Sequence, residues 1–454
     1  MVGSVSISGW RAVVAGTVAT LVVGTGLAAA ATPDGVESDA VATRVAVGPR
    51  LQQANGPSLQ PAISADGRFV AFASGASNLV AGDTNGAYDV FVRDRAAQMT
   101  RRVSVGPGGH QANGFSFDSA ISANGRFVAF PSSASNLVAG DTNGSADVFV
   151  RDRAAQVTRR VSVGPGGQQA DDESFDSAIS ADGRFVAFPS FATNLVARDR
   201  NGAFDVFVRD RVAQVTRRVS VGAGGQEGYR GSRDPAISAD GRFVAFDSYA
   251  WNFVAGDTNG NQDVFVRDRK AQVTRRVSVG TGGQQANRRS YCMAISASGR
   301  FVLFASNATN LVAGDTNGSY DVFVRDRKAQ VTRRVSVGAG GQQANDFSFD
   351  SAISTDGRFV VFESAASNLV AGDSNGVDDV FVRDRVAQLT RRVSVGSGGQ
   401  QANGLSNQVA ISAGGRFVAF VSEASNLVAG DTNGLADVFV RDRVAQVTRR
   451  VSVG

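Results

Sequence analysis

Residues 82–95 read G-D-T-N-G-A-Y-D-V-F-V-R-D-R, and this stretch decides the fold because the chain repeats it. Its first aspartate recurs at positions 83, 141, 199, 257, 315, 373 and 431, so every interval is 58 residues, without insertion or deletion. A fixed period over most of 454 residues is typical of a repeat architecture rather than of two or three separate domains. The close identity of the seven repeats indicates recent duplication.

Each repeat contains four strand signals. In the first complete repeat they are Pro61–Ser64, Arg68–Ala73, Asp89–Arg95 and Arg101–Val105. The second and third strands carry apolar residues at consecutive positions, F-V-A-F and V-F-V, which indicates burial of both faces. The fourth alternates polar and apolar residues, as a half-exposed outer strand does. We therefore predict an all-β protein, a seven-bladed β-propeller of four-stranded antiparallel blades. A β-solenoid is the alternative, although its coils are normally much shorter.

Two of these segments carry a family resemblance. S-A-D-G-R-F-V-A-F at 64–72, followed by D-V-F-V-R-D at 89–94, resembles the WD40-like repeat of TolB-type propellers. The resemblance extends over residues 43–454. It implies that the Asp-Gly turn and the aromatic strand residues are structural, and that the protein is a binding or scaffolding propeller outside the cytoplasm.

The closure of the ring is left open by a surplus strand. Residues 44–48 (R-V-A-V-G) are an eighth copy of strand four, and the chain also ends on such a copy, Arg449–Val453. We expect residues 43–47 to pair with the last blade. The C-terminal copy would then be displaced or would add a fifth, edge strand.

The N-terminus has the features of a secretion signal. Arg11 precedes an apolar stretch, Ala12–Leu27, and a run of alanines ends at Ala31. We predict a cleavable signal peptide at residues 1–31, a linker at 32–42 and a single propeller domain at 43–454, with the mature protein secreted or at the cell surface. An uncleaved anchor helix is the alternative, but three glycines weaken the apolar run.

Catalytic residues are scarce. His110 is the only histidine and Cys292 the only cysteine, and none of the common nucleophile or metalloprotease motifs is present. An active site needs residues found once, whereas most carboxylates here recur in every repeat. The sequence thus predicts a protein that is not an enzyme and has no catalytic residues. The alternative is a polysaccharide lyase or hydrolase with its site in the central channel.

The repeated D-T-N-G-x-x-D loop is the best candidate for metal binding, because it offers hard oxygen ligands at the alternate spacing that Ca²⁺ loops use. The candidate ligands are Asp83, Asn85, Asp89, Asp141, Asn143, Asp147, Asp257, Asn259, Asp263, Asp315, Asn317, Asp321, Asp373, Asn375, Asp379, Asp431, Asn433 and Asp437. The other interpretation is a hairpin in which Asn-Gly turns and the aspartates cap backbone N–H groups. Repeat three is excluded because Arg198 and Arg200 flank Asp199, and we expect that copy to be empty. A Ca²⁺-stabilised scaffold is accordingly a further possible function.

The charge pattern disfavours nucleic acid as a partner. The net charge is +5, but 41 acidic residues are interspersed among 46 basic ones, which is typical of a solvated surface with ion pairs. We expect a monomer with no membrane span after signal cleavage, and a protein or an envelope polymer as its partner.

Sequence variation points to one face of the propeller. In an antiparallel blade, the loop between strands two and three and the connection to the next blade emerge on the same side, and the repeats differ most there. Tyr, Trp and Arg are favoured at binding surfaces, and around the fourth repeat this variable face gains Tyr229, Arg230, Arg233, Tyr249, Trp251, Arg288, Arg289 and Tyr291. We predict that these residues bind the partner, neutral drift in loops being the alternative.

Overall fold

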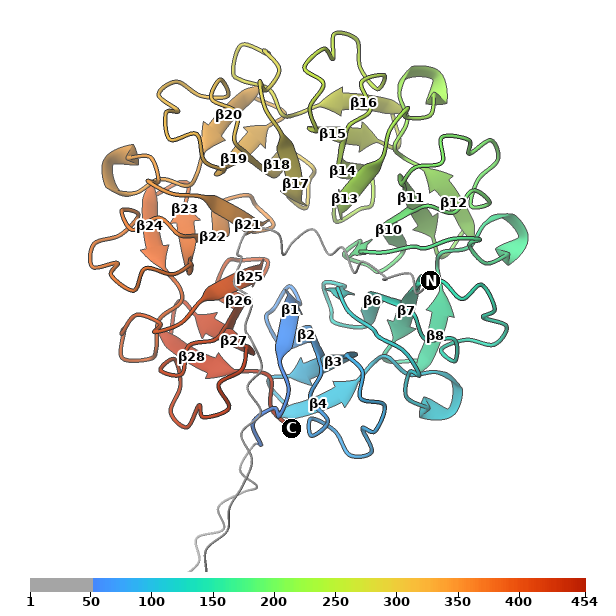
Figure 1. Cartoon of the computed structure of the whole chain (residues 1–454), viewed down its shortest axis with the longest axis horizontal. Coiled ribbons are helices and arrows are strands. Elements are labelled where there is room, and N and C mark those ends of the chain that lie inside the picture. Colours follow the sequence, from blue (N-terminus) through green and yellow to red (C-terminus); the bar gives the residue numbers. More distant parts are fainter. Residues whose placement is uncertain (1–51) are drawn as a thin grey trace, which may run out of the picture. The chain divides into compact units, whose positions relative to one another are not determined.

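The computed structural model describes residues 52–454, which form a closed ring of seven four-stranded antiparallel sheets (Figure 1). The first blade contains β1 (Ser58–Ile63), β2 (Phe69–Ser74), β3 (Asp89–Asp94) and β4 (Met99–Arg102), from the centre outward. All seven sheets keep the order of the sequence, so each blade is one contiguous segment. The predicted seven-bladed propeller with 58-residue repeats is confirmed.

The remaining strands follow the same plan. The innermost strands are β5 (Ala120–Ile121), β9 (Ala178–Ile179), β13 (Ser232–Ile237), β17 (Ser290–Ile295), β21 (Ser348–Ile353) and β25 (Ser406–Ile411). The second strands are β6 (Phe127–Ser132), β10 (Phe185–Ser190), β14 (Phe243–Ser248), β18 (Phe301–Ser306), β22 (Phe359–Ser364) and β26 (Phe417–Ser422). The third strands are β7 (Asp147–Asp152), β11 (Asp205–Asp210), β15 (Asp263–Asp268), β19 (Asp321–Asp326), β23 (Asp379–Asp384) and β27 (Asp437–Asp442). The outer strands are β8 (Val157–Arg160), β12 (Val215–Arg218), β16 (Val273–Arg276), β20 (Val331–Arg334), β24 (Leu389–Arg392) and β28 (Val447–Arg450). Four short 3₁₀ turns, η2 (Pro107–Gly109), η3 (Pro165–Gly167), η4 (Ala223–Gly225) and η5 (Ala339–Gly341), lie in connections between blades.

The outer strand differs from the prediction. It covers Met99–Arg102 rather than 101–105, because Val105 leaves the sheet and forms a bridge with Gln111 in the next connection. Val103 still donates its N–H to the Val90 carbonyl at 2.8 Å. The apolar end of the predicted strand therefore belongs to the connection between neighbouring blades.

Aromatic packing between blades forms the core. Phe72 and Phe91 of the first blade stack with ring centroids 5.9 Å apart and pack against apolar residues of the last blade. Each of the seven buried clusters likewise combines residues of two neighbouring blades. The Asp-Gly type turn contributes as well. Gly125 has φ +71°, and a Cβ atom there would lie 2.2 Å from the ring of Phe69 in the preceding blade. Glycine is required at this position both by the backbone conformation and by the neighbouring ring.

Within residues 52–454, the ring closes without exchanging a strand. The C-terminal copy of strand four, β28, is the ordinary outer strand of the last blade, so the expectation that it is displaced or forms a fifth strand is wrong. Gln53 forms a bridge with Val453, as Gln111 does with Val105, and Ser58 donates its N–H to the Ala436 carbonyl at 2.8 Å. Ordinary connection contacts therefore suffice to close the ring. Residues 43–47, the predicted signal peptide at 1–31 and the linker at 32–42 lie outside the described residues.

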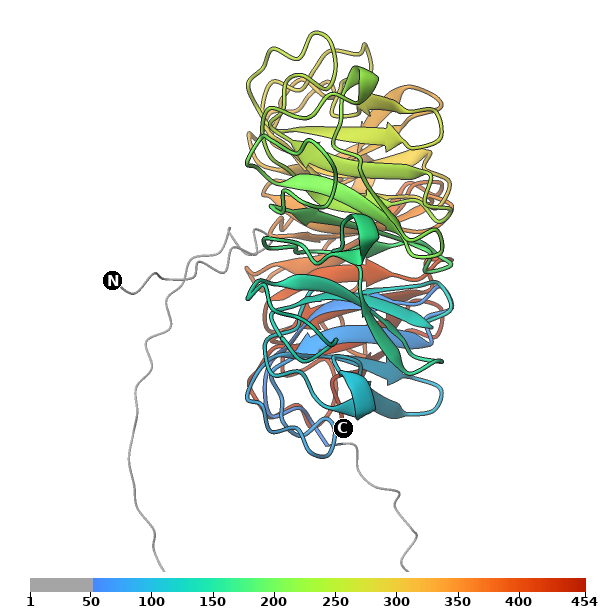
Figure 2. The same ribbon diagram turned by 90° about the vertical axis from the view of Figure 1, so that its right-hand side faces the viewer.

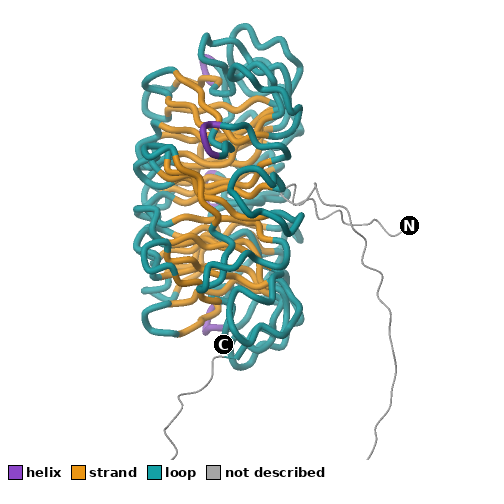
Figure 3. The backbone as a smooth tube through the Cα atoms, turned by 90° about the vertical axis from the view of Figure 1, so that its left-hand side faces the viewer, coloured by secondary structure: helices purple, strands orange, loops and turns teal. Residues whose placement is uncertain are grey.

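The propeller has two unlike faces. Ser58, Ser74 and Asp89 lie in register, so the β2–β3 loop and the connection to the next blade share one side; we call the corresponding side of all seven blades the loop face. The short β1–β2 and β3–β4 turns form the opposite face, and side views show the strands between the two layers of loops (Figures 2 and 3). No helix within residues 52–454 has the length and apolar character needed to cross a membrane.

Candidate functional site

An arginine from strand four holds each acidic loop on the loop face. In the first blade, Arg102 Nη1 lies 3.1 Å from Asp83 Oδ1 and 2.9 Å from Asp89 Oδ2. Asp89 is fully buried, and Ser104 Oγ donates to its other oxygen at 2.5 Å. Burial raises the pKa of Asp83, and the charge of Arg102 opposes that rise. The guanidinium group thus supplies the positive charge that the paired carboxylates need.

The loop asparagine takes part in the turn. Asn85 Oδ1 accepts the N–H of Ala87 at 3.0 Å, while its Nδ2 donates to Asp89 Oδ2 and to the Ala112 carbonyl, both at 2.9 Å. The structure brings the predicted Asp, Asn and Asp residues together, but with the contacts of the hairpin interpretation. Ca²⁺ binding at these loops remains a prediction.

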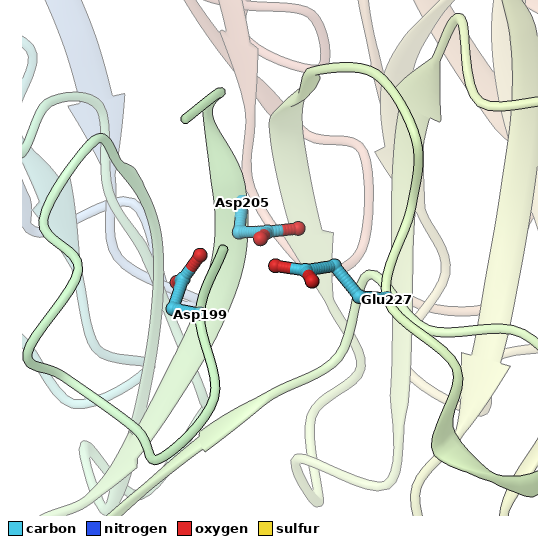
Figure 4. Close-up of side chains that lie close together, drawn as sticks. All are labelled: Asp199, Asp205 and Glu227. Carbon is cyan, nitrogen blue, oxygen red and sulfur yellow. The ribbon is translucent and has the colours of Figure 1, made fainter. Parts of the chain in front are cut away.

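The third blade departs from this pattern because Glu227 occupies a position that is glutamine elsewhere, as at Gln111. Arg218 Nη1 contacts three carboxylates there: Asp199 at 3.3 Å, Asp205 at 2.8 Å and Glu227 at 2.6 Å. Figure 4 shows these three carboxylates, which point toward one another. Ligand oxygens of these three residues all lie within 4.8 Å of one another. Among the described residues, three acidic side chains therefore gather closely enough to hold a metal ion in the loop that we expect to be empty. Comparison of the repeats at position 227 would have revealed it.

One guanidinium group faces three acids in this cluster. Burial and the neighbouring Asp205 raise the pKa of Asp199 to about 7. Glu227 also accepts the backbone N–H of Arg200 at 2.9 Å, and Arg218 donates to the Arg198 carbonyl at 3.3 Å. These contacts use the backbones of Arg198 and Arg200, the two arginines whose charge we expect to repel a cation.

The residues predicted to bind a partner divide into two groups. Arg230, Arg288 and Arg289 are exposed, as are Tyr229 and Trp251 at 55% and 53%. The rings of Tyr229 and Trp251 are 5.0 Å apart and tilted by 58°.

The other group is partly buried nearer the inner strands. Arg233 lies over the ring of Phe204 at 4.7 Å, and Tyr291 packs against Phe349 at 5.7 Å. Burial raises the pKa of Tyr291 to about 12 and also raises the pKa of Tyr249, which is partly buried. These three residues, Arg233, Tyr249 and Tyr291, support the loop face more than they present a surface.

Two acids at the inner ends of the blades were missed. Asp247 in β14 is fully buried where other repeats carry Ala, Pro, Val or Glu, and it accepts Gln262 Nε2 at 2.6 Å and the Cys292 N–H at 3.1 Å. Burial, with Asp234 as the next cause, holds its pKa well above the usual range. Glu363 occupies the same position in β22, and its pKa is raised in the same way. The departure from the repeat pattern was visible in the sequence, but the contact with Asp234 was not.

No protein-family model and no curated protein matches the chain. Many solved structures share its fold. Oligogalacturonate lyase from Vibrio parahaemolyticus is 11% identical, with a TM-score of 0.50, over 86% of this chain and 90% of that one. The β-propeller domain of the Trilobed protease from Pyrococcus furiosus, described as having an open velcro topology, is 9% identical, with a TM-score of 0.51, over 87% and 97%. TolB from Acinetobacter baumannii is 12% identical, with a TM-score of 0.40, over 81% and 76%.

These comparisons correct one expectation. A prolyl endopeptidase structure is also similar, with 10% identity and a TM-score of 0.54 over 88% of this chain and 50% of that one. The prediction that the chain is not an enzyme is contradicted, because a lyase and peptidases are built on this propeller. Its physical basis, the single histidine, was too narrow, since catalysis can rest on other groups. At such low identity the likeness shows the fold alone and assigns no reaction.

Proposed function

We propose that the chain binds a protein or a cell-envelope polymer through its loop face, between blades 3 and 5. The exposed pair Tyr229–Trp251 carries this proposal. Two large aromatic rings that remain half in water offer apolar contact area of the kind that dominates binding energy.

The aromatic pair replaces a polar pair that the other blades keep. Asn55 Nδ2 donates to Ser77 Oγ at 2.9 Å in the first blade, and Asn403 does the same to Ser425 at 3.0 Å in the last. Blade 4 has Tyr229 in place of the asparagine and Trp251 in place of the serine, and the two side chains still touch.

One backbone contact of this connection is kept after the substitution. Tyr229 N–H donates to Asn252 Oδ1 at 3.1 Å, just as Asn55 N–H donates to Asn78 Oδ1 at 3.0 Å. The two substitutions have therefore altered the surface chemistry and kept this backbone contact. Independent drift gives no reason for both partners of one contact to change to aromatic residues.

The residues of the other blades define a variant that tests this proposal. Tyr229→Asn with Trp251→Ser restores the pair of the other blades, so we expect the unfolding midpoint to stay within about 2 °C, since surface changes are usually small. Capture of envelope polymers or proteins on the immobilised protein should fall at least about tenfold, as loss of two anchoring aromatics implies. Undiminished capture by this variant would refute the proposal.

A matched control installs the same pair elsewhere. Asn113→Tyr with Ser135→Trp changes the corresponding contact of blade 2, which is now a 3.0 Å hydrogen bond. Binding should not increase, because the neighbouring side chains differ there.

Export is part of the same proposal. It is supported by the charge and apolar pattern of the first 31 residues. Cell fractionation with N-terminal sequencing tests it, and an intact N-terminus on cytoplasmic protein would contradict it.

Cation binding is a second candidate, favoured by the cluster of Asp199, Asp205 and Glu227. Carboxylate oxygens suit Ca²⁺ or Mn²⁺, which would have to displace Arg218 from them. Calorimetric titration with either ion should give heat for the native protein and none for Glu227→Gln. Equal heats, or none in both, would remove this candidate.

A further inference from the structure

We infer that the ligand of the loop face is an acidic polysaccharide, bound through carboxylates to arginines around the aromatic pair. This inference rests on the proposed function and adds the chemical class of the ligand. We call five exposed residues on the loop face of blades 3 to 5 the arginine patch: Arg198, Arg200, Arg230, Arg288 and Arg289.

The segments that carry the patch form one continuous surface. The β10–β11 loop meets the connection into blade 4, where Arg200 N–H donates to Glu227 at 2.9 Å. That connection meets the β14–β15 loop through Tyr229 and Asn252, and Asn261 Nδ2 in this loop donates to the Asn287 carbonyl at 3.4 Å. The aromatic pair thus lies within the patch.

The positive charges of the arginine patch are not neutralised by ion pairs within residues 52–454. Among the described residues, the ion pairs involve arginines that recur in every blade, such as Arg68 with Asp94 at 2.7 Å and Arg102 with Asp89 at 2.9 Å, and none of the five patch residues. Guanidinium groups match carboxylates in a bidentate geometry and stack on flat apolar surfaces. Guanidinium groups that lack a carboxylate partner and lie beside exposed rings suit a ligand with both carboxylates and apolar ring faces.

One patch residue is retained at a conformational cost. Arg198 has φ +63°, in the left-handed region, and the other six repeats have glycine there, as at Gly140 with φ +71°. A non-glycine residue in this conformation is strained, and such strain concentrates at functional sites. An arginine that lowers the stability of its own loop is explained if its charge is used.

The surroundings favour a polymer of moderate charge density. Asp171 and Asp172 are exposed on the connection into blade 3, and Asp346 is exposed on the connection into blade 6. Duplex nucleic acid carries one charge per about 1.7 Å and would meet these acids as it left the patch. A polysaccharide with at most one carboxylate per sugar fits the limited patch better, and each apolar sugar face can lie on a ring of the pair.

The test uses four polymers of defined chemistry on the full chain, followed by biolayer interferometry. Carboxymethylcellulose and hydroxyethylcellulose share a backbone but differ in charge, while oligo(dT) and polyglutamate are polyanions of other classes. We expect carboxymethylcellulose to bind at least about tenfold more tightly than the other three, and more weakly as salt rises, because salt screens exposed charges.

Two variants separate this inference from the proposed function. Arg198→Gly with Arg200→Thr restores the residues of the other repeats; it should raise the melting temperature by relieving the strained backbone and weaken carboxymethylcellulose binding roughly fivefold to tenfold. Tyr229→Asn with Trp251→Ser should weaken binding without that gain in stability.

The outcomes are distinct. Equal binding of the neutral polymer that is lost only in the aromatic variant would overturn the acidic ligand and keep the proposed function. Preference for oligo(dT) or polyglutamate would overturn the inference in favour of a nucleic acid or an acidic peptide. Absence of binding to carboxymethylcellulose, or binding unaffected by the arginine variant, would overturn it outright.

Discussion

Replacing Glu227 with glutamine should stabilise the protein at neutral and alkaline pH. The change restores the residue that the other blades carry and leaves Arg218 with two carboxylates instead of three. In blade 5 the glutamine at this position, Gln343, donates to Asp315 at 3.0 Å and to Asp321 at 3.1 Å. The variant should gain the same contacts and lose one negative charge.

The size of the effect follows from Asp199, whose pKa rises from an ordinary 3.8 to about 7. A raised pKa means that the folded state holds the proton more tightly, so stability is greatest below about pH 4 and is lost as the pH rises to 7. About three pKa units correspond to an upper limit of ~4 kcal/mol. Burial and Asp205 are the larger causes of this rise and remain in the variant, and the contacts with the Arg200 N–H and with Arg218 that lower the pKa of Glu227 are lost. With screening at the surface, the glutamine would therefore recover no more than ~1 kcal/mol.

The assay is urea unfolding of native protein and Glu227→Gln at pH 4, 6 and 8. We expect the unfolding free energies to agree at pH 4 and the variant to exceed the native protein by up to ~1 kcal/mol at pH 8. The reciprocal control, Gln343→Glu, should create a second acidic cluster and lower stability at pH 8 by a similar amount. A gain that is independent of pH, or a loss at pH 8, would refute the electrostatic reasoning.

Three further predictions concern the fold. Gly125→Ala should lower the free energy of unfolding by ~2–4 kcal/mol, since the new Cβ meets the Phe69 ring and φ is +71°. Gly140→Ala, with the same φ and open space around it, should lower it by only ~1 kcal/mol. Equal losses in urea unfolding would contradict the packing argument. Phe91→Ala removes a fully buried ring between blades and should cost ~3–5 kcal/mol in the same assay, and a loss below ~1 kcal/mol would show that the blades do not depend on it. Asp247→Asn should reduce the fall in stability between pH 5 and 9, because the raised pKa of Asp247 makes its buried carboxyl unfavourable once it ionises; an unchanged pH profile would show that another group governs it.

The sequence predicts the blade well because its information is local. Phe-Val-Ala-Phe and Val-Phe-Val mark strands buried on both faces, and the structure buries Phe72 and Phe91 completely. The end of strand four was misplaced, since Val105 is apolar in either role and only its partner Gln111 decides between sheet and connection. Spacing alone cannot distinguish these two uses of a valine.

The sequence predicts which loops carry the candidate site, but it does not predict which side chains of the site touch one another. Tyr229 and Trp251 are 22 residues apart in the sequence, and only the fold shows that their rings touch. Glu227 stood out from the repeat, yet its effect depends on Arg218 reaching back from strand four. Side chains that meet through tertiary structure leave no local signal, so charge balance could not be judged from the loop alone.

The contiguous blades have an evolutionary consequence. Because each blade within residues 52–454 is one contiguous segment, a duplication or deletion of one 58-residue unit would add or remove a complete blade without rethreading any other. The number of blades is then set by how neighbouring blades fit around the axis, not by the order of strands in the gene. Each unit can also acquire substitutions separately, and blade 4 shows how one unit can gain a new surface while six copies preserve the scaffold.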